Sequence, residues 1–186
     1  AYFTRLTQTF VNWLSRPTAE GSLYEVDMRL RPDGDKGAVA VGLERFTEYY
    51  RKDAWVWEKL ALAKARIITE PAQAPALVTA LTKAIYETTQ HPIDLPIVGN
   101  AVLDMRRRLR DAHGSAPALQ LRKLPGGMAE LDLLLQGLRL VNADLFTGTG
   151  QDQIEIISTL VRHERISQTD ATNLESASQL FSNVYA

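Results

Sequence analysis

Hydrophobic residues recur at three- and four-residue steps near the start of the chain, at Phe3, Leu6, Phe10 and Leu14. This spacing is typical of an amphipathic helix. We predict that the helix ends near Pro17, because a proline disfavours helical geometry in the residue before it. The first segment is therefore predicted to be a helix with one apolar face.

The pattern changes to strict alternation over residues 23–31. Apolar side chains fall on one side and charged side chains on the other: Tyr24, Val26, Met28 and Leu30, against Glu25, Asp27, Arg29 and Arg31. Alternation with period two predicts a strand with one buried face. A turn-rich loop over residues 32–37 then leads to the apolar residues 38–41, which are predicted to return as the second strand of a hairpin.

Helical spacing dominates after residue 42, with prolines marking a predicted linker near residues 68–76. Residues 128–141 are apolar on most sides and are predicted to form a central helix. The predicted fold class is predominantly α (α+β), with short antiparallel strands followed by a helical bundle. The predicted domains are residues 1–70 and 71–186.

The 186 residues include 21 Lys and Arg, 22 Asp and Glu and no Cys. The absence of Cys excludes disulfides, thiolate catalysis and Cys-based metal sites. A formal net charge of -1 gives no general attraction to nucleic acid or to anionic lipid. No apolar run is long enough to cross a membrane. We expect a cytoplasmic protein, a binder of neither nucleic acid nor membrane.

The charged face of the predicted strand is the first candidate for chemistry. A carboxylate on a strand can hold Mg²⁺ together with phosphate oxygens, and neighbouring arginines suit bidentate phosphate contacts. This reading predicts metal-assisted phosphoryl or nucleotidyl transfer. The alternative is a solvated strand face with cross-strand ion pairs of about 0.2–1 kcal/mol each. The pattern alone leaves both readings open.

Three stretches resemble one family of enzymes. They are Tyr24-Glu25-Val26-Asp27-Met28-Arg29-Leu30-Arg31-Pro32, Ala54-Trp55-Val56-Trp57-Glu58-Lys59 continuing to Lys64-Ala65-Arg66, and residues 123–136 with Gly126-Gly127 followed by acidic residues. Together they resemble glutamine synthetase adenylyltransferase. The resemblance implies a nucleotidyltransferase domain of the polymerase-β type, followed by a helical bundle. Enzymes of this family have two related halves, one that attaches AMP and one that removes it. The motif with a tryptophan at position 55 is more similar to that of the attaching, C-terminal half.

The resemblance also implies an activity, cofactors and partners. The family transfers AMP from ATP to a tyrosine of glutamine synthetase and so regulates nitrogen assimilation. Mg²⁺ is implied as cofactor, ATP as substrate, and glutamine synthetase and the signalling protein PII as partners. Asp27 matches the third metal carboxylate of the family, so it is the expected catalytic and metal residue.

Four cationic residues of these stretches are the expected nucleotide and phosphate contacts: Arg29, Arg31, Lys64 and Arg66. A Gly-Ser turn followed by an Asp-x-Asp pair precedes this carboxylate in the family, and residues 1–26 contain no Gly-Ser followed by an Asp-x-Asp pair. The chain is therefore expected to be an inactive piece of a longer enzyme.

Three points remain open in the sequence. Glu130 and Asp132 align with an acidic pair of the family, but acids in the first turn of a helix are also favoured by the helix dipole. A second hypothesis makes the helical region after Ala72 a non-catalytic module that binds PII or glutamine synthetase. Finally, unpaired edges of the predicted strands would need cover, either from the bundle or from a second copy of the chain.

Overall fold

The computed structural model describes residues 2–22, 24, 26–28, 30–67, 75–113, 122 and 124–185. These residues divide into two compact units, Ala1–Ala54 and Trp55–Ala186. The predicted boundary near residue 70 rests on the family resemblance, as the end of a nucleotidyltransferase domain. The division into compact units is a different criterion and does not test that boundary. That boundary stays a prediction.

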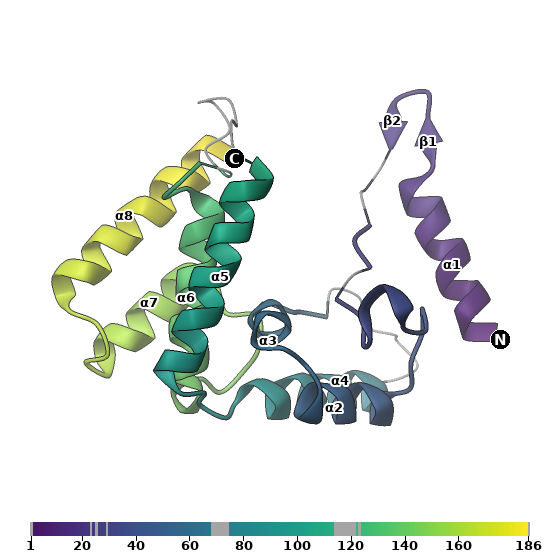
Figure 1. Ribbon diagram of the computed structural model, residues 1–186, viewed down its shortest axis with the longest axis horizontal. Helices are drawn as coiled ribbons and strands as arrows, with labels where there is room; N and C mark the ends of the chain where they lie inside the picture. Colours follow the sequence, from purple (N-terminus) through teal and green to yellow (C-terminus); the bar gives the residue numbers. More distant parts are fainter. Residues whose placement is uncertain are drawn as a thin grey trace. The chain divides into compact units, whose positions relative to one another are not determined.

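Eight α-helices account for most of the described residues (Figure 1). Their bounds are α1 Tyr2–Ser15, α2 Leu43–Lys52, α3 Val56–Ala63, α4 Pro75–Thr89, α5 Leu95–His113, α6 Met128–Val141, α7 Gln153–Arg162 and α8 Gln168–Tyr185. Two 3-10 turns, η1 Gly34–Lys36 and η2 Ala143–Leu145, complete the helical structure. The predominantly helical prediction is confirmed. No helix of the described residues is long and apolar enough to span a membrane.

The predicted hairpin is wrong in the part of residues 23–41 that the structure describes. Tyr24 and residues 26–28 have no regular structure, residues 30–37 form turns and η1, and residues 38–41 form bends and coil. The strands lie elsewhere, in a two-residue antiparallel pair of β1 Pro17–Thr18 and β2 Gly21–Ser22. A strand needs a partner for its backbone groups. At Leu30 the backbone carbonyl accepts from a side chain, the Tyr50 hydroxyl, at 2.9 Å.

The first unit keeps an amphipathic helix but does not bury its apolar face. Helix α1 ends at Ser15 as predicted, yet none of its residues is buried. The apolar stripe of α1 is largely exposed, including Phe3 at 70%, Phe10 at 57% and Trp13 at 69%. The predicted exposed strand edge is not observed among the described residues, so pairing with a second copy stays a prediction.

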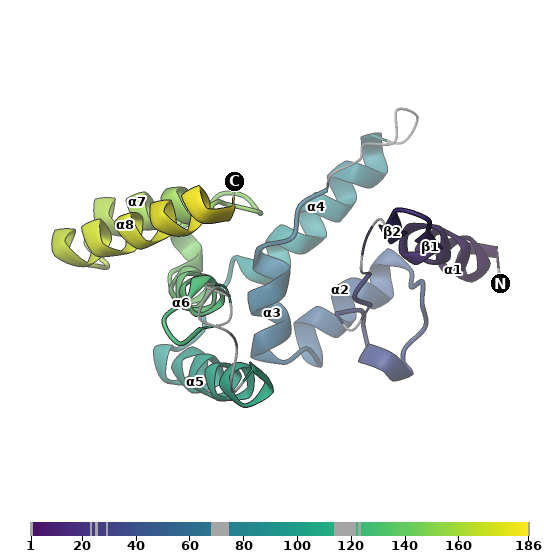
Figure 2. The same cartoon turned by 90° about the horizontal axis from the view of Figure 1, so that it is seen from above.

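The second unit is built around α6, as its apolar pattern predicted. Helix α6 contacts α3, α5, α7 and α8, and Figure 2 shows it between α5 and the α7–α8 pair. One core cluster joins α6 to α7 and α8 through Leu131, Leu135, Ile156, Ile157, Leu160, Ala171 and Phe181. A second cluster joins it to α3 and α5 through Leu60, Ala63, Val98 and Leu140. Gly137 permits the close approach of α5, because a Cβ there would meet Val102 Cγ2 at 2.9 Å.

Candidate functional site

Two of the predicted phosphate-binding residues lie at the end of α3. The chain leaves the helix at Lys64, whose backbone N–H donates to the Ala61 carbonyl at 3.2 Å, and the Ala65 N–H donates to the Leu62 carbonyl at 2.9 Å. The Lys64 ammonium contacts Asp132 Oδ2 of α6 at 2.5 Å. Gln153 Nε2 donates to the other oxygen of the same carboxylate at 2.5 Å. Asp132 therefore joins α3, α6 and the start of α7.

A tight loop places a glycine directly against the residues that follow α3. Gly150 has φ 71°, and its N–H donates to the Ala63 carbonyl at 3.3 Å. A Cβ at this position would lie 3.2 Å from Arg66 Cβ and 3.3 Å from the Ala65 carbonyl oxygen. Both the left-handed backbone and the close packing require glycine here. The loop over residues 147–152 is thus fixed beside Arg66.

These contacts surround a cavity of about 470 Å³. Its polar wall includes Lys64, Arg66, Asp132 and Gln153, and Arg66 itself is exposed. The structure therefore places Lys64 and Arg66 at one cavity, and their contact with a ligand stays a prediction. Lys64 already has Asp132 as its counter-charge, so an anion here would share the ammonium with that carboxylate.

Glu130, the other acid of the predicted pair, has a structural role. Its carboxylate accepts hydrogen bonds from Arg106 Nε at 2.7 Å, Arg110 Nε at 2.8 Å and the Gly126 N–H at 3.1 Å. Burial acts to raise the pKa of Glu130, but hydrogen bonds from Arg110, Gly126 and Arg106 outweigh it and hold this pKa below its usual value. The carboxylate fastens the first turn of α6 to α5.

The remaining predicted site residues belong to the first unit. Asp27 is exposed. Arg31 Nη1 donates to the Met28 carbonyl at 2.6 Å, and Nε donates to the Gly37 carbonyl at 3.4 Å, so Arg31 holds the turn together. Arg29 lies outside the described residues.

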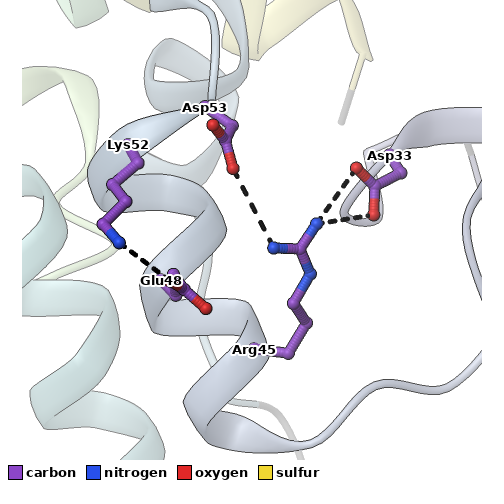
Figure 3. Close-up of polar contacts among 5 residues, drawn as sticks. All are labelled: Asp33, Arg45, Glu48, Lys52 and Asp53. Atoms are coloured by element: carbon purple, nitrogen blue, oxygen red, sulfur yellow. Dashed lines mark hydrogen bonds and ion pairs between the residues drawn. The ribbon is translucent and has the colours of Figure 1, made fainter.

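Ion pairs around α2 tie down the loop that follows Arg31 (Figure 3). Arg45 contacts both oxygens of Asp33, the closer at 3.1 Å, and reaches Asp53 at 3.9 Å. The hydrogen bond to Asp33 raises the pKa of Arg45. Asp33 precedes η1 with φ 62°, which an aspartate tolerates better than most residues. Asp33 therefore has a local structural role.

Comparison with known proteins gives the family. Residues 1–80 match the family model described as glutamate-ammonia ligase adenylyltransferase. A bifunctional glutamine synthetase adenylyltransferase/adenylyl-removing enzyme from Rhodopseudomonas palustris (strain TIE-1) is 35% identical over 188 residues, covering 98% of this chain. The chain belongs to the glutamate-ammonia ligase adenylyltransferase family.

Other enzymes of the same name agree with this assignment. The one from Agrobacterium fabrum (strain C58 / ATCC 33970) is 40% identical over 140 residues, which is 75% of this chain and 14% of that protein. The one from Mesorhizobium japonicum is 38% identical over 135 residues, which is 73% of this chain and 13% of that protein. The chain spans 18% of the length of the Rhodopseudomonas palustris enzyme.

The metal that this adenylyltransferase family implies finds one candidate ligand in the expected position. Asp27 can supply one carboxylate, and Mg²⁺ uses one or two carboxylates together with waters and phosphate oxygens. Among the residues that the structure describes, no group of three His, Asp or Glu side chains could hold a metal ion. The donor set of the described residues therefore fits Mg²⁺ only in part.

Sequence reasoning missed several residues of the larger cavity. Gln153 was not a candidate, because nothing in a linear pattern places α7 beside Asp132. The sequence feature that could have indicated this loop is Gly148-Thr149-Gly150, because two glycines in three residues favour a tight loop. Trp55, at the start of α3, does not bury its side chain, which is 71% exposed. The backbone N–H of Trp55 instead donates to Glu58 Oε2 at 2.8 Å at the start of α3.

Proposed function

We propose that this chain is part of an enzyme that transfers AMP from ATP to a tyrosine of glutamine synthetase, within the half that attaches AMP. The relatives are named for adenylyl transfer to glutamine synthetase and for its reversal. The observation that carries the proposal is the 35% identity that extends over 98% of the chain. The Trp55-Val56-Trp57 stretch, which resembles the attaching half, supports the choice of half.

Lys64 and Arg66 are proposed to contact the phosphates of ATP. Their position on one cavity supports this, as does the exposure of Arg66. A triphosphate carries more negative charge than the single carboxylate of Asp132 and would attract the Lys64 ammonium. Because Gln153 also holds Asp132, this carboxylate would keep its position while Lys64 turns to the phosphate.

Asp27 is proposed to hold Mg²⁺, with Arg29 and Arg31 near the phosphates. When bound, Mg²⁺ would supply charge neutralisation for the transferred group. The chain alone is proposed to be inactive, because residues 1–26 contain no Gly-Ser turn followed by an Asp-x-Asp pair. We also propose cytoplasmic action and regulation by PII, as the family resemblance implies.

The test is transfer of labelled AMP to glutamine synthetase by the parent enzyme. We expect transfer by the parent and none by the isolated chain. Arg66→Gln in the parent should raise the KM for ATP about tenfold, because a charge-assisted phosphate contact is lost. Arg107→Gln, which removes an exposed arginine of α5, is the matched control and should leave the KM unchanged. A parent enzyme with no AMP transfer would support the non-catalytic module that binds PII or glutamine synthetase.

A further inference from the structure

A second cavity, of about 240 Å³, also borders the Lys64–Asp132 pair. Its walls are mostly apolar and include Trp57, Leu60, Met105, Leu109, Met128 and Leu133. Pockets that take drug-sized ligands have volumes of about 300–1,000 Å³. This smaller volume suits one fused-ring fragment. Aromatic and thioether side chains favour flat heteroaromatic rings, through stacking and sulfur–aromatic contacts.

One polar side chain in the wall lacks a hydrogen bond. Gln136 of α6 is only 4% exposed, and its Oε1 has no partner among the described residues. Buried polar groups in folded proteins nearly always have a partner, and a buried acceptor left unpaired destabilises the fold. A ligand with an N–H donor in this cavity would remove that cost. Gln136 lines both cavities.

A glutamine amide distinguishes adenine from other purines by its hydrogen-bonding pattern. The amide oxygen accepts from the amino group of adenine, while the amide nitrogen donates to the adjacent ring nitrogen. Guanine presents two acceptors on the same edge, so its carbonyl would face the amide oxygen. A purine that lacks the amino group leaves that oxygen unpaired.

The two cavities are adjacent. Lys64, Met128, Asp132 and Gln136 line both of them. A nucleotide with its base in the smaller cavity would extend its phosphates past Lys64 toward Arg66. We propose that the smaller cavity is a subsite for an adenine base and that Gln136 recognises the base through its amide. The identification of the nucleotide as ATP rests on the proposed function, whereas the recognition of adenine rests on the cavity itself.

Calorimetric titration of this chain with adenosine, and separately with purine riboside, tests the proposal. The wild type should bind adenosine about fivefold more tightly than purine riboside, the worth of one net hydrogen bond. Gln136→Leu should bind the two nucleosides equally. Gln168→Leu, the same substitution at an exposed position of α8, should keep the preference.

Thermal unfolding without ligand separates recognition from a structural role. Gln136→Leu removes an unpaired buried acceptor, so its melting temperature should equal or exceed that of the wild type. A melting temperature well below the wild type would instead show that Gln136 supports the fold, and would overturn the proposal. Ala61→Leu, which fills the smaller cavity from α3, provides a second variant and should weaken adenosine binding at least fivefold.

Failure of this proposal differs from failure of the proposed function. Absent adenosine binding, or a preference for adenosine that survives Gln136→Leu, overturns the adenine subsite even where the parent enzyme transfers AMP. A parent enzyme without transfer activity, combined with adenosine binding that depends on Gln136, overturns the function and supports the subsite.

Discussion

The Glu130 clamp, the contacts of the Glu130 carboxylate with Arg106 and Arg110, joins α5 to α6 and provides a test of how the helical unit is stabilised. The carboxylate is 11% exposed and binds Arg106 and Arg110, whose side chains are 42% and 43% exposed. In Glu130→Gln one oxygen becomes an NH2 group, which cannot accept from an arginine, and the other oxygen loses its charge, so both charge-assisted hydrogen bonds are lost. Buried charge-assisted hydrogen bonds contribute about 1.5–3 kcal/mol each, and solvent screening of half-exposed arginines reduces this to about 1 kcal/mol each. We expect Glu130→Gln to lower the free energy of unfolding by about 2 kcal/mol.

Urea denaturation measures this change, and a melting temperature lower by about 4–8 °C should accompany it. Asp104→Asn is the matched control, because it neutralises an acid of α5 whose pair with Arg108 is exposed at both side chains. This control should cost less than about 0.5 kcal/mol. Equal and small decreases in the free energy of unfolding of Glu130→Gln and Asp104→Asn would show that Glu130 does not hold α5 and α6 together.

The effect of Glu130→Gln on the free energy of unfolding should depend on pH in a definite direction. Because the pKa of Glu130 lies below its usual value in the folded chain, its contribution to stability is present above the unfolded pKa, near 4.3. The contribution disappears as the pH falls through the folded pKa. The difference in free energy of unfolding between wild type and Glu130→Gln should therefore be constant from pH 7 to about pH 5 and shrink below that. A difference that grows on acidification would contradict the assignment.

Two further variants test the loop beside the larger cavity. Gly150→Ala should lower the free energy of unfolding, measured by urea denaturation, by about 2 kcal/mol, because its backbone is left-handed and a Cβ would crowd Arg66. The control Gly126→Ala is also at positive φ but has open space around it, so it should lower this free energy by about 1 kcal/mol. Equal costs would show that the loop does not pack as described. Arg139 donates to Gln151 Oε1 and to the Gly148 carbonyl, both at 2.9 Å, and a lysine cannot make both hydrogen bonds in this geometry. Arg139→Lys should therefore lower the free energy of unfolding by about 2 kcal/mol and speed amide hydrogen exchange over residues 147–152. Unchanged exchange in that loop would show that Arg139 does not hold it.

Periodicity predicted the helices well because each helix satisfies its own backbone. Residues 128–141 were predicted to form the central helix, and α6 has those bounds. The strand prediction failed at Tyr24 and residues 26–28, the described part of this stretch, because alternation indicates a strand but identifies no partner for it. A strand depends on hydrogen bonds from elsewhere in the chain, and the expected partner, residues 38–41, forms bends and coil.

The candidate site was predictable where it lies in contiguous motifs and not where it depends on packing. The motif ending in Lys64-Ala65-Arg66 identified two residues that share a cavity. Nothing in the sequence indicated that Gln136 would be buried without a partner, because that depends on the environment supplied by α3 and α5. Likewise, the contact of Gly150 with Arg66 joins segments that lie far apart along the chain.

We propose that this chain belongs to an adenylyl-transferring enzyme in which Asp27 is a metal-binding carboxylate. The most direct measurement is the rate of labelled AMP transfer from ATP to glutamine synthetase by the parent enzyme, with and without Asp27→Asn. Loss of a metal ligand should lower the rate about 100-fold or more. The control Asp33→Asn, which breaks only the exposed pair with Arg45, should retain most of the rate. Near-normal transfer by Asp27→Asn would contradict the account.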